Sequence, residues 1–157
     1  MKNVFFPDVE ISENDLYFVC SMIERTARKM KQPNKYVVNR MGKRGLEEKL
    51  SVANVLHSDN PEAVMHQWIE EYGLETGDFD VTRVNPSLVT TLPTPLQMGK
   101  VYTRLILSTM TRDEDYADGI LRVYNNPICE VIDNYNGSAY YEPSYFITRA
   151  YNQGSFN

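Results

Sequence analysis

The sequence has few of the residue types that carry metal, redox and nucleophilic chemistry. Its 157 residues include two histidines, two cysteines and one tryptophan. A serine or cysteine nucleophile needs a neighbouring base, and neither histidine stands in a recognisable nucleophile motif. Glycine-rich phosphate-binding loops of the dinucleotide or P-loop kind are also absent. The sequence therefore predicts no catalytic residue and no cofactor, and it leans away from an enzyme.

Long apolar runs and paired cysteines are lacking too. No stretch approaches the roughly twenty apolar residues of a membrane-spanning helix. The apolar stretch before Pro7 is too short for the core of a signal peptide. Cys20 and Cys129 lie far apart in apolar patterns, where cysteine usually behaves as a small hydrophobe. We therefore expect a cytoplasmic protein with no membrane contact and no disulfide.

What the sequence does have is the apolar periodicity of helices. Hydrophobic residues make up 42% of the chain, enough for one folded domain. A helix is predicted from Ser12, which with Asp15 resembles a capping box, to about Lys31. Pro33 ends it, because proline disfavours helical geometry in the residue before it. The inward positions recur at three- and four-residue steps: Leu16, Val19, Cys20, Ile23, Ala27 and Met30.

The segment 34–73 continues this helical pattern. A short helix is expected before Gly42 and Gly45, which permit the chain to turn, and a second helix follows the turn. Asn60-Pro61 is typical of a helix start, with asparagine as the cap and proline at the first helical position. This segment is therefore predicted as helix, turn, helix, exposed connection and helix.

Residues 74–95 lose the periodicity and contain several prolines and threonines, which predicts an irregular linker across the surface. Helical periodicity returns over 96–152, where Thr111 and Glu114 resemble a capping box at a helix start.

The predicted fold class is all-α. We expect one domain spanning the chain, a compact bundle of about six to seven helices. Its first unit covers 12–73 and its second covers 96–152.

The two helical units align weakly when the first is shifted by 82 positions. The matched pairs are Leu46 with Ile128, Glu48 with Glu130, Leu50 with Ile132, Pro61 with Pro143, Val64 with Phe146 and Met65 with Ile147. Few identities survive, so a pseudo-duplicated three-helix unit and a chance similarity both stay open.

Positive charge is concentrated in residues 24–49. This segment holds nine basic and three acidic residues, whereas the whole chain has a net charge of −5. Three interpretations stay open: a solvated face that complements the acidic half of the same chain or of a dimer, a surface for a protein partner, and a surface for nucleic acid. The candidate binding residues are Arg25, Arg28, Lys29, Lys35, Arg40, Lys43 and Arg44.

Two alternative functions follow from short patterns. The segment 34–50 resembles a helix-turn-helix, which favours a DNA-binding regulator. The pattern does not, however, identify a side chain that would contact the DNA bases. The second alternative is a metal-dependent enzyme. Glu62, His66 and Glu70 share one helix stripe, and His57 is the only further histidine that could complete a metal site.

Eleven tyrosines are the other compositional feature, and the last quarter of the chain is rich in them. Tyrosine offers a large contact area with a polar tip and is enriched at interfaces. Tyr140, Tyr141 and Tyr145 are therefore candidate partner-binding residues, and a homodimer is one expectation. The alternative is that these rings plug the edges of a small helical core.

Three stretches carry a family resemblance: LYFVCSMIERTARKM, YVVNRMGKRGLEEKL and VLHSDNPEAVMHQWIEEYG. They resemble a small bacterial family of all-helical proteins of unknown function, often encoded beside ADP-ribosyltransferase-like proteins. The match covers residues 16–73, mostly at packing positions. The resemblance implies a non-catalytic partner protein, such as the antitoxin-like member of a toxin and antitoxin pair, and it supplies no catalytic residues. Our leading prediction is therefore a protein-interaction module.

Overall fold

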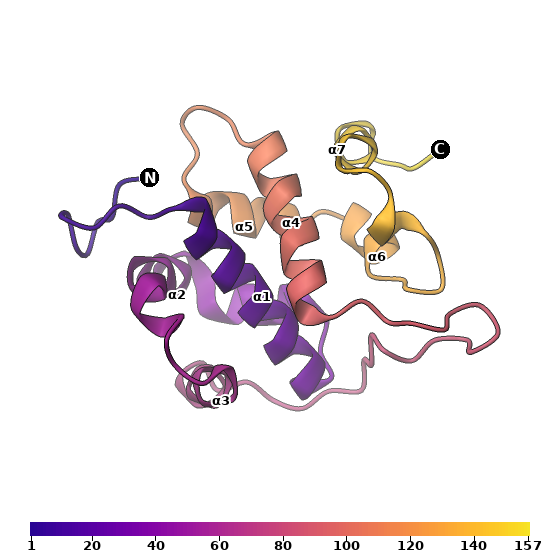
Figure 1. Cartoon of the computed structure of the whole chain (residues 1–157), viewed down its shortest axis with the longest axis horizontal. Helices are drawn as coiled ribbons and strands as arrows, with labels where there is room; N and C mark the ends of the chain where they lie inside the picture. The colour runs from indigo at the N-terminus through magenta and orange to yellow at the C-terminus, as the bar shows by residue number, and fades with distance from the viewer.

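Helix α1, Glu13–Met30, is the central element of the computed structural model, which describes all residues from Met1 to Asn157. Ser12 and Asp15 form the predicted capping box: the Asp15 N–H donates to Ser12 Oγ over 3.2 Å, and the Ser12 N–H donates to Asp15 Oδ2 over 2.8 Å. The helix ends at Lys31, which is left-handed with φ 51°. The predicted bounds of this helix are confirmed. In Figure 1, α1 and α4 run through the middle of the molecule.

Helix α2, Asn34–Leu56, follows after Pro33 and packs against α1. Its backbone leaves helical geometry at Gly42, where φ is 68° and ψ is 176°. Gly45 is helical and buried, and an added Cβ would lie 2.9 Å from the hydroxyl of Tyr72. The two-glycine turn predicted here is therefore a kink at Gly42 alone, whereas Gly45 is kept small by close packing.

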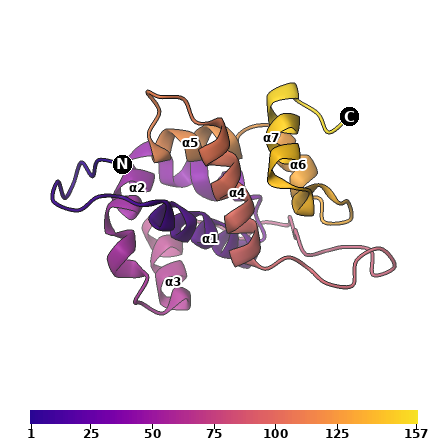
Figure 2. The same ribbon diagram turned by 45° about the horizontal axis from the view of Figure 1, so that its top comes forward.

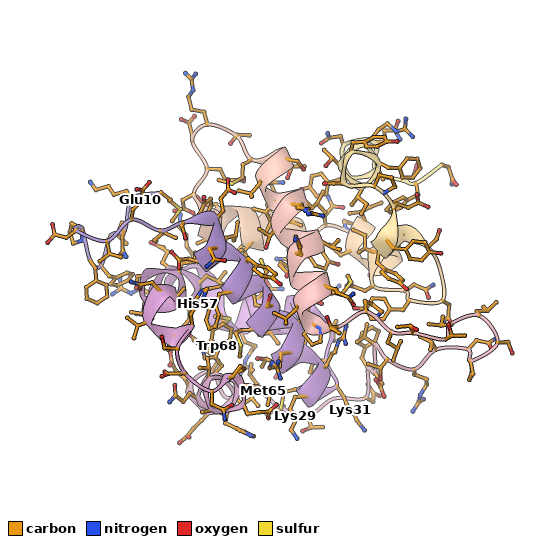
Figure 3. The ribbon with its side chains drawn as sticks, in the orientation of Figure 1. Glu10, Lys29, Lys31, His57, Met65 and Trp68 are labelled. Atoms are coloured by element: carbon orange, nitrogen blue, oxygen red, sulfur yellow. The ribbon has the colours of Figure 1, made fainter.

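Helix α3, Pro61–Glu71, begins as predicted, because the side chain of Asn60 caps it by accepting from the N–H of Glu62. Its residues Met65 and Trp68 are buried toward α1 (Figure 3). The following segment, 74–94, has no regular secondary structure, as predicted. In Figure 1 it runs from α3 along the lower edge of the molecule and loops outward before α4.

The second half of the chain holds four helices and one short 3₁₀ turn. These are α4, Pro95–Thr109; α5, Tyr116–Tyr124; α6, Ile128–Ile132; η1, Ala139–Tyr141; and α7, Ser144–Gln153. The predicted capping box at Thr111 and Glu114 is wrong, because α5 is capped by Asp115 and Asp118 instead. The Asp118 N–H donates to Asp115 Oδ1 over 2.8 Å, and Thr111 to Glu114 form a preceding turn.

The helices share one hydrophobic core, with buried residues from all seven α-helices. Helix α1 packs against α2, α3 and α4, while α5 packs against α2 and α4, and α7 packs against α4. The all-α bundle is therefore confirmed. Figure 2 shows α6 and α7 side by side at one end of the bundle, opposite the N-terminal segment. None of the helices combines the length and the apolar character needed to cross a bilayer.

Candidate functional site

The basic segment 24–49 faces acidic side chains of the same chain. Its lysines and arginines form ion pairs with α3, α5 and α6. The pairs are Arg25 with Glu62 at 3.3 Å, Lys35 with Glu130 at 3.8 Å, Lys43 with Asp118 at 2.8 Å and Lys49 with Glu71 at 2.7 Å. The hydrogen bond between Lys43 and Asp118 raises the pKa of Lys43 and lowers that of Asp118.

The other candidate residues of this segment also have internal contacts, with one exception. Arg40 donates to the backbone carbonyls of Tyr72 and Gly73 and so completes the C-terminal end of α3. Arg28 donates to the hydroxyl of Tyr135, and Arg44 pairs with Glu48. Lys29 is exposed and has no ion pair; Figure 3 shows it beside Lys31 at the C-terminal end of α1. Most of the positive charge expected for a partner thus contacts groups of the chain itself, and three of these side chains, Arg40, Lys43 and Lys49, connect α2 to the C-terminal end of α3 and to α5.

The residues of the proposed metal site do not come together. Glu62, His66 and Glu70 are exposed, and Glu62 pairs with Arg25. His57 instead stacks on the ring of Phe18 with 4.5 Å between ring centroids, and its Nε2 lies 3.9 Å from Asp15. No group of three or more histidine, cysteine, aspartate or glutamate side chains is placed to hold a metal ion.

The tyrosine-rich end forms a groove, which we call the tyrosine groove. It has a volume of about 460 Å³ and lies between α4 and the residues around η1. Its lining residues are Thr91, Leu92, Pro93, Gln97, Met98, Val101, Arg104, Tyr140, Tyr141 and Glu142. Tyr140 packs edge-to-face on Tyr135 at 5.2 Å and on Tyr141 at 4.9 Å. These contacts fix the rings in place, although Tyr141 is 67% exposed.

The tyrosine groove carries one basic side chain, that of Arg104, which forms no ion pair. Arg104 lines it and is exposed, and Lys100 lies one helical turn earlier on the same side of α4. The acidic residue of the lining is Glu142, which accepts a hydrogen bond from Ser138 Oγ at 3.3 Å. The structure therefore brings together an exposed tyrosine and a free arginine, the residue types most enriched at binding hot spots.

A second site was not predicted from the sequence: two carboxyl groups meet inside the bundle. The side-chain amide of Asn34 donates to Glu24 Oε2 at 3.1 Å and to Asp133 Oδ2 at 3.0 Å. The hydroxyl of Tyr102 donates to Asp133 Oδ1 at 2.6 Å. Glu24 of α1 is 4% exposed, whereas Asp133, which follows α6, is half-buried, and Asn34 of α2 and Tyr102 of α4 complete the network. We call Glu24 and Asp133 the acid pair.

The acid pair holds protons more tightly than ordinary carboxylates do. Burial raises the pKa of Glu24 to about 8, and the charge of Asp133 adds to the shift. Burial likewise raises the pKa of Asp133 to about 7, opposed by its hydrogen bonds from Tyr102 and Asn34. Because two nearby carboxylates resist ionising together, the pair retains a proton near neutral pH.

The sequence holds only a faint signal of the acid pair. Glu24 is four residues after Cys20 and three before Ala27, so it falls on the apolar stripe of α1, where a charged residue requires a partner. That partner, Asp133, is more than a hundred residues away in the sequence. Helical periodicity reveals that Glu24 is buried, but it carries no information about which distant side chain lies beside it.

Comparison with known proteins finds no match to this chain. No protein-family model, no curated protein and no solved structure matches it. The resemblance of residues 16–73 to a small bacterial family therefore stays a prediction.

Proposed function

We propose that this chain is a non-catalytic protein-interaction module, and that its tyrosine groove takes an acidic segment of a partner protein. The observation that supports the proposal is the position of Arg104. This arginine lines an aromatic groove and has no ion pair, whereas most basic residues of segment 24–49 pair with acidic residues of the chain itself.

The lining of the groove offers apolar, aromatic and charged contacts to a peptide segment. Its walls come from the end of the linker, from α4 and from the residues around η1, and they expose Tyr141 beside the aliphatic side chains of Leu92 and Val101. Rigid tyrosines supply contact area at a low cost in conformational entropy, and arginine adds directional hydrogen bonds to carboxylates. An acidic segment would gain both kinds of contact.

The family resemblance adds a candidate for the partner. It implies an ADP-ribosyltransferase-like protein encoded nearby, which this chain would neutralise by binding it. Co-expression of the two chains tests this narrower form of the proposal: co-purification with loss of toxicity would support it. The broader proposal of an acidic partner segment does not depend on this particular protein.

The test is affinity capture from the cell that produces this chain, with the purified full-length chain as bait. We expect one protein to be captured by the wild type and lost with Arg104→Glu or Tyr141→Ser. Arg112→Glu is the matched control, because Arg112 is also exposed and free of ion pairs but lies in the connection between α4 and α5. Cross-linking should then map the bound segment of the partner to an acidic stretch.

Three results would overturn the proposal. One is capture that persists in both groove variants, and another is a wild-type chain that captures no protein and remains monomeric at high concentration. The third is a wild-type dimer that Tyr141→Ser dissociates, because the groove would then hold a second copy rather than an acidic partner. Light scattering behind size-exclusion chromatography measures the oligomeric state in the same samples.

A further inference from the structure

The step Asn136-Gly137 lies in the connection between α6 and η1 and is the only place in the chain where glycine follows an asparagine. An asparagine is open to attack on its own side chain, because the backbone nitrogen of the next residue can reach the side-chain amide carbon. Most residues obstruct this attack with their Cβ atom, and glycine has none. The step is therefore a candidate for covalent change without an enzyme.

The structure leaves both residues of this step accessible. Residues 136–138 are exposed, and a Cβ atom added to Gly137 would meet only the carbonyl oxygen of Asn134, at 3.5 Å. The Gly137 N–H donates to that same oxygen over 3.0 Å. A single exposed turn bond opens locally at little cost in free energy, so the Gly137 nitrogen becomes free without unfolding of the helices.

The corresponding aspartate step is protected. Asp118-Gly119 is the only place where glycine follows an aspartate, and it lies inside α5. There the Gly119 N–H donates to the carbonyl of Asp115 over 3.0 Å, and the Asp118 carboxylate pairs with Lys43 at 2.8 Å. Helical geometry and this ion pair hold Asp118-Gly119 in place, so Asn136-Gly137 is the more reactive of the two steps.

The side chain of Asn136 also ties the linker to the connection between α6 and η1. Its Oδ1 accepts a hydrogen bond from the N–H of Asn85 over 2.7 Å. Asn85 begins a turn, since its carbonyl accepts from the N–H groups of Leu88 and Val89. Figure 1 shows the linker looping outward on the same side of the molecule as α6. The bond from Asn85 to Asn136 therefore anchors the loop 85–89 at its base.

We propose that Asn136 is a site of spontaneous deamidation, and that its isoaspartate product releases the loop 85–89 from the connection between α6 and η1. The Gly137 nitrogen gives up its proton and forms a bond to Asn136 Cγ, the Cγ–Nδ2 bond breaks, and Nδ2 leaves as ammonia. One water molecule then opens the cyclic imide. Cleavage of the new bond between Cγ and the Gly137 nitrogen yields aspartate, and cleavage of the original peptide bond yields isoaspartate.

The two products differ at the contact with Asn85. Aspartate keeps a carboxylate oxygen in the place of Oδ1, and that oxygen accepts from the Asn85 N–H. In isoaspartate the main chain runs through Cβ and Cγ, so the chain gains a methylene and the former side-chain carbonyl becomes the peptide carbonyl before Gly137. The acceptor then moves away from Asn85, whose N–H bonds to water instead. This change does not depend on the protein-interaction function.

The first test follows the chemistry in the full-length chain. Purified protein is incubated at mildly alkaline pH, and peptide mapping by mass spectrometry separates asparagine, aspartate and isoaspartate at position 136. We expect Asn136 to convert faster than every other asparagine. Gly137→Ala should slow the conversion severalfold, since its methyl group hinders the attack and has room in the fold. An Asn136 that stays intact through the incubation, or equal rates in Gly137→Ala and the wild type, would overturn the proposal.

Limited digestion with trypsin measures the release of the loop, because Arg83 is exposed and is the only basic residue in segment 74–95. Aged protein enriched in isoaspartate should be cleaved after Arg83 severalfold faster than fresh protein. Asn136→Ala, which lacks the acceptor, should also be cleaved faster. Asn136→Asp is the matched control, because it keeps an acceptor on a normal backbone and should be cleaved at the wild-type rate.

Two results of the digestion would contradict the release of the loop. Equal cleavage of all four samples would show that the bond from Asn85 to Asn136 does not anchor it. Cleavage of Asn136→Asp as fast as that of Asn136→Ala would assign the effect to the loss of the amide rather than to the altered backbone of isoaspartate.

Discussion

Gly99 of α4 lies directly against Ser21 of α1. A Cβ atom built on Gly99 would be 2.8 Å from both the Cα and the backbone nitrogen of Ser21, closer than such atoms approach in real structures. Because the obstacle is backbone, a side-chain rotation cannot relieve the contact. The lack of a side chain at Gly99 therefore allows the short distance between α1 and α4. The acid pair depends on this distance, because Glu24 lies on α1 and Tyr102, which donates to Asp133, lies on α4.

Gly99→Ala should lower the free energy of unfolding by about 1 to 3 kcal/mol, the usual cost of overpacking a core. Gly137→Ala is the matched control, since its added methyl would meet only a backbone oxygen at 3.5 Å. Urea unfolding followed by circular dichroism at 222 nm measures both variants. Equal stability of Gly99→Ala and the wild type would show that α1 and α4 can separate without penalty.

The acid pair should make the protein less stable as the pH rises. In the folded state the pKa of Glu24 is raised to about 8 and that of Asp133 to about 7, whereas carboxyls of an unfolded chain titrate near pH 4. Between these limits the folded state binds more protons, so the free energy of unfolding must decrease as the pH increases. We expect the free energy of unfolding to decrease by about 1.4 kcal/mol per pH unit for each retained proton, several kcal/mol in all between pH 5 and pH 8, measured by urea unfolding at each pH.

Glu24→Gln separates this effect from other titrations. The amide keeps an oxygen that can accept from Asn34 but cannot ionise, so the variant should lose less stability between pH 5 and pH 8 than the wild type. Glu130→Gln is the control, because Glu130 is exposed and its pair with Lys35 is long, at 3.8 Å. A wild-type curve that rises toward pH 8 would contradict the inferred shifts.

The parts of this structure that the sequence predicts are those with local signals. The helix at 13–30 follows from its apolar stripe and its capping box, and α3 follows from Asn60-Pro61. The sequence predicts the start of α5 too early, because Thr111 to Glu114 and Asp115 to Asp118 both offer side chains suited to capping. Packing selects between two adjacent capping patterns, and packing is not a local property.

The distribution of charge along the sequence likewise shows where charged residues are concentrated but not which residues they pair with. The density of positive charge over 24–49 is visible in the sequence, and a complementary acidic half was one of the open interpretations. Pairs such as Lys43 with Asp118 and Lys49 with Glu71 agree with that interpretation. The orientation of α3, α4 and α5 determines which acidic side chains form these ion pairs. It also leaves Arg104 without an ion pair in the tyrosine groove. Spacing along one helix does not contain that information.

Both cysteines should resist thiol reagents while the protein is folded. Cys20 is fully buried, and burial raises its pKa to about 12. Cys129 is 4% exposed, its pKa is also raised by burial, and its thiol donates to the carbonyl of Val123 at 2.9 Å. Since the thiolate is the reactive form, Ellman's reagent at pH 8 should label neither residue in buffer and both in urea. Rapid labelling of the folded protein would show that one thiol is more accessible than the structure indicates.

Arg122 ties α5 to α4 and α7 through a geometry that lysine cannot reproduce. Its Nε and Nη2 donate to the two carboxylate oxygens of Glu114, both at 2.7 Å, and its Nη1 donates to Tyr151 Oη at 2.8 Å and to Thr109 Oγ1 at 3.0 Å. This two-point bond raises the pKa of Arg122 and keeps it charged. A lysine ammonium is a single point and cannot span Glu114, Thr109 and Tyr151 together.

We therefore expect Arg122→Lys to lower the free energy of unfolding by about 1 to 2 kcal/mol, even though the charge is kept. In a double-mutant cycle with Glu114→Gln, the coupling energy should exceed about 0.5 kcal/mol. The control is Arg44→Lys, because Arg44 is 79% exposed, its one ion pair is with Glu48 on its own helix, and lysine can keep the cation over the ring of Phe5, so this change should cost little. If Arg122→Lys lowered the free energy of unfolding no more than Arg44→Lys does, the multiple hydrogen bonds of the Arg122 guanidinium would contribute nothing beyond its charge to the position of α5.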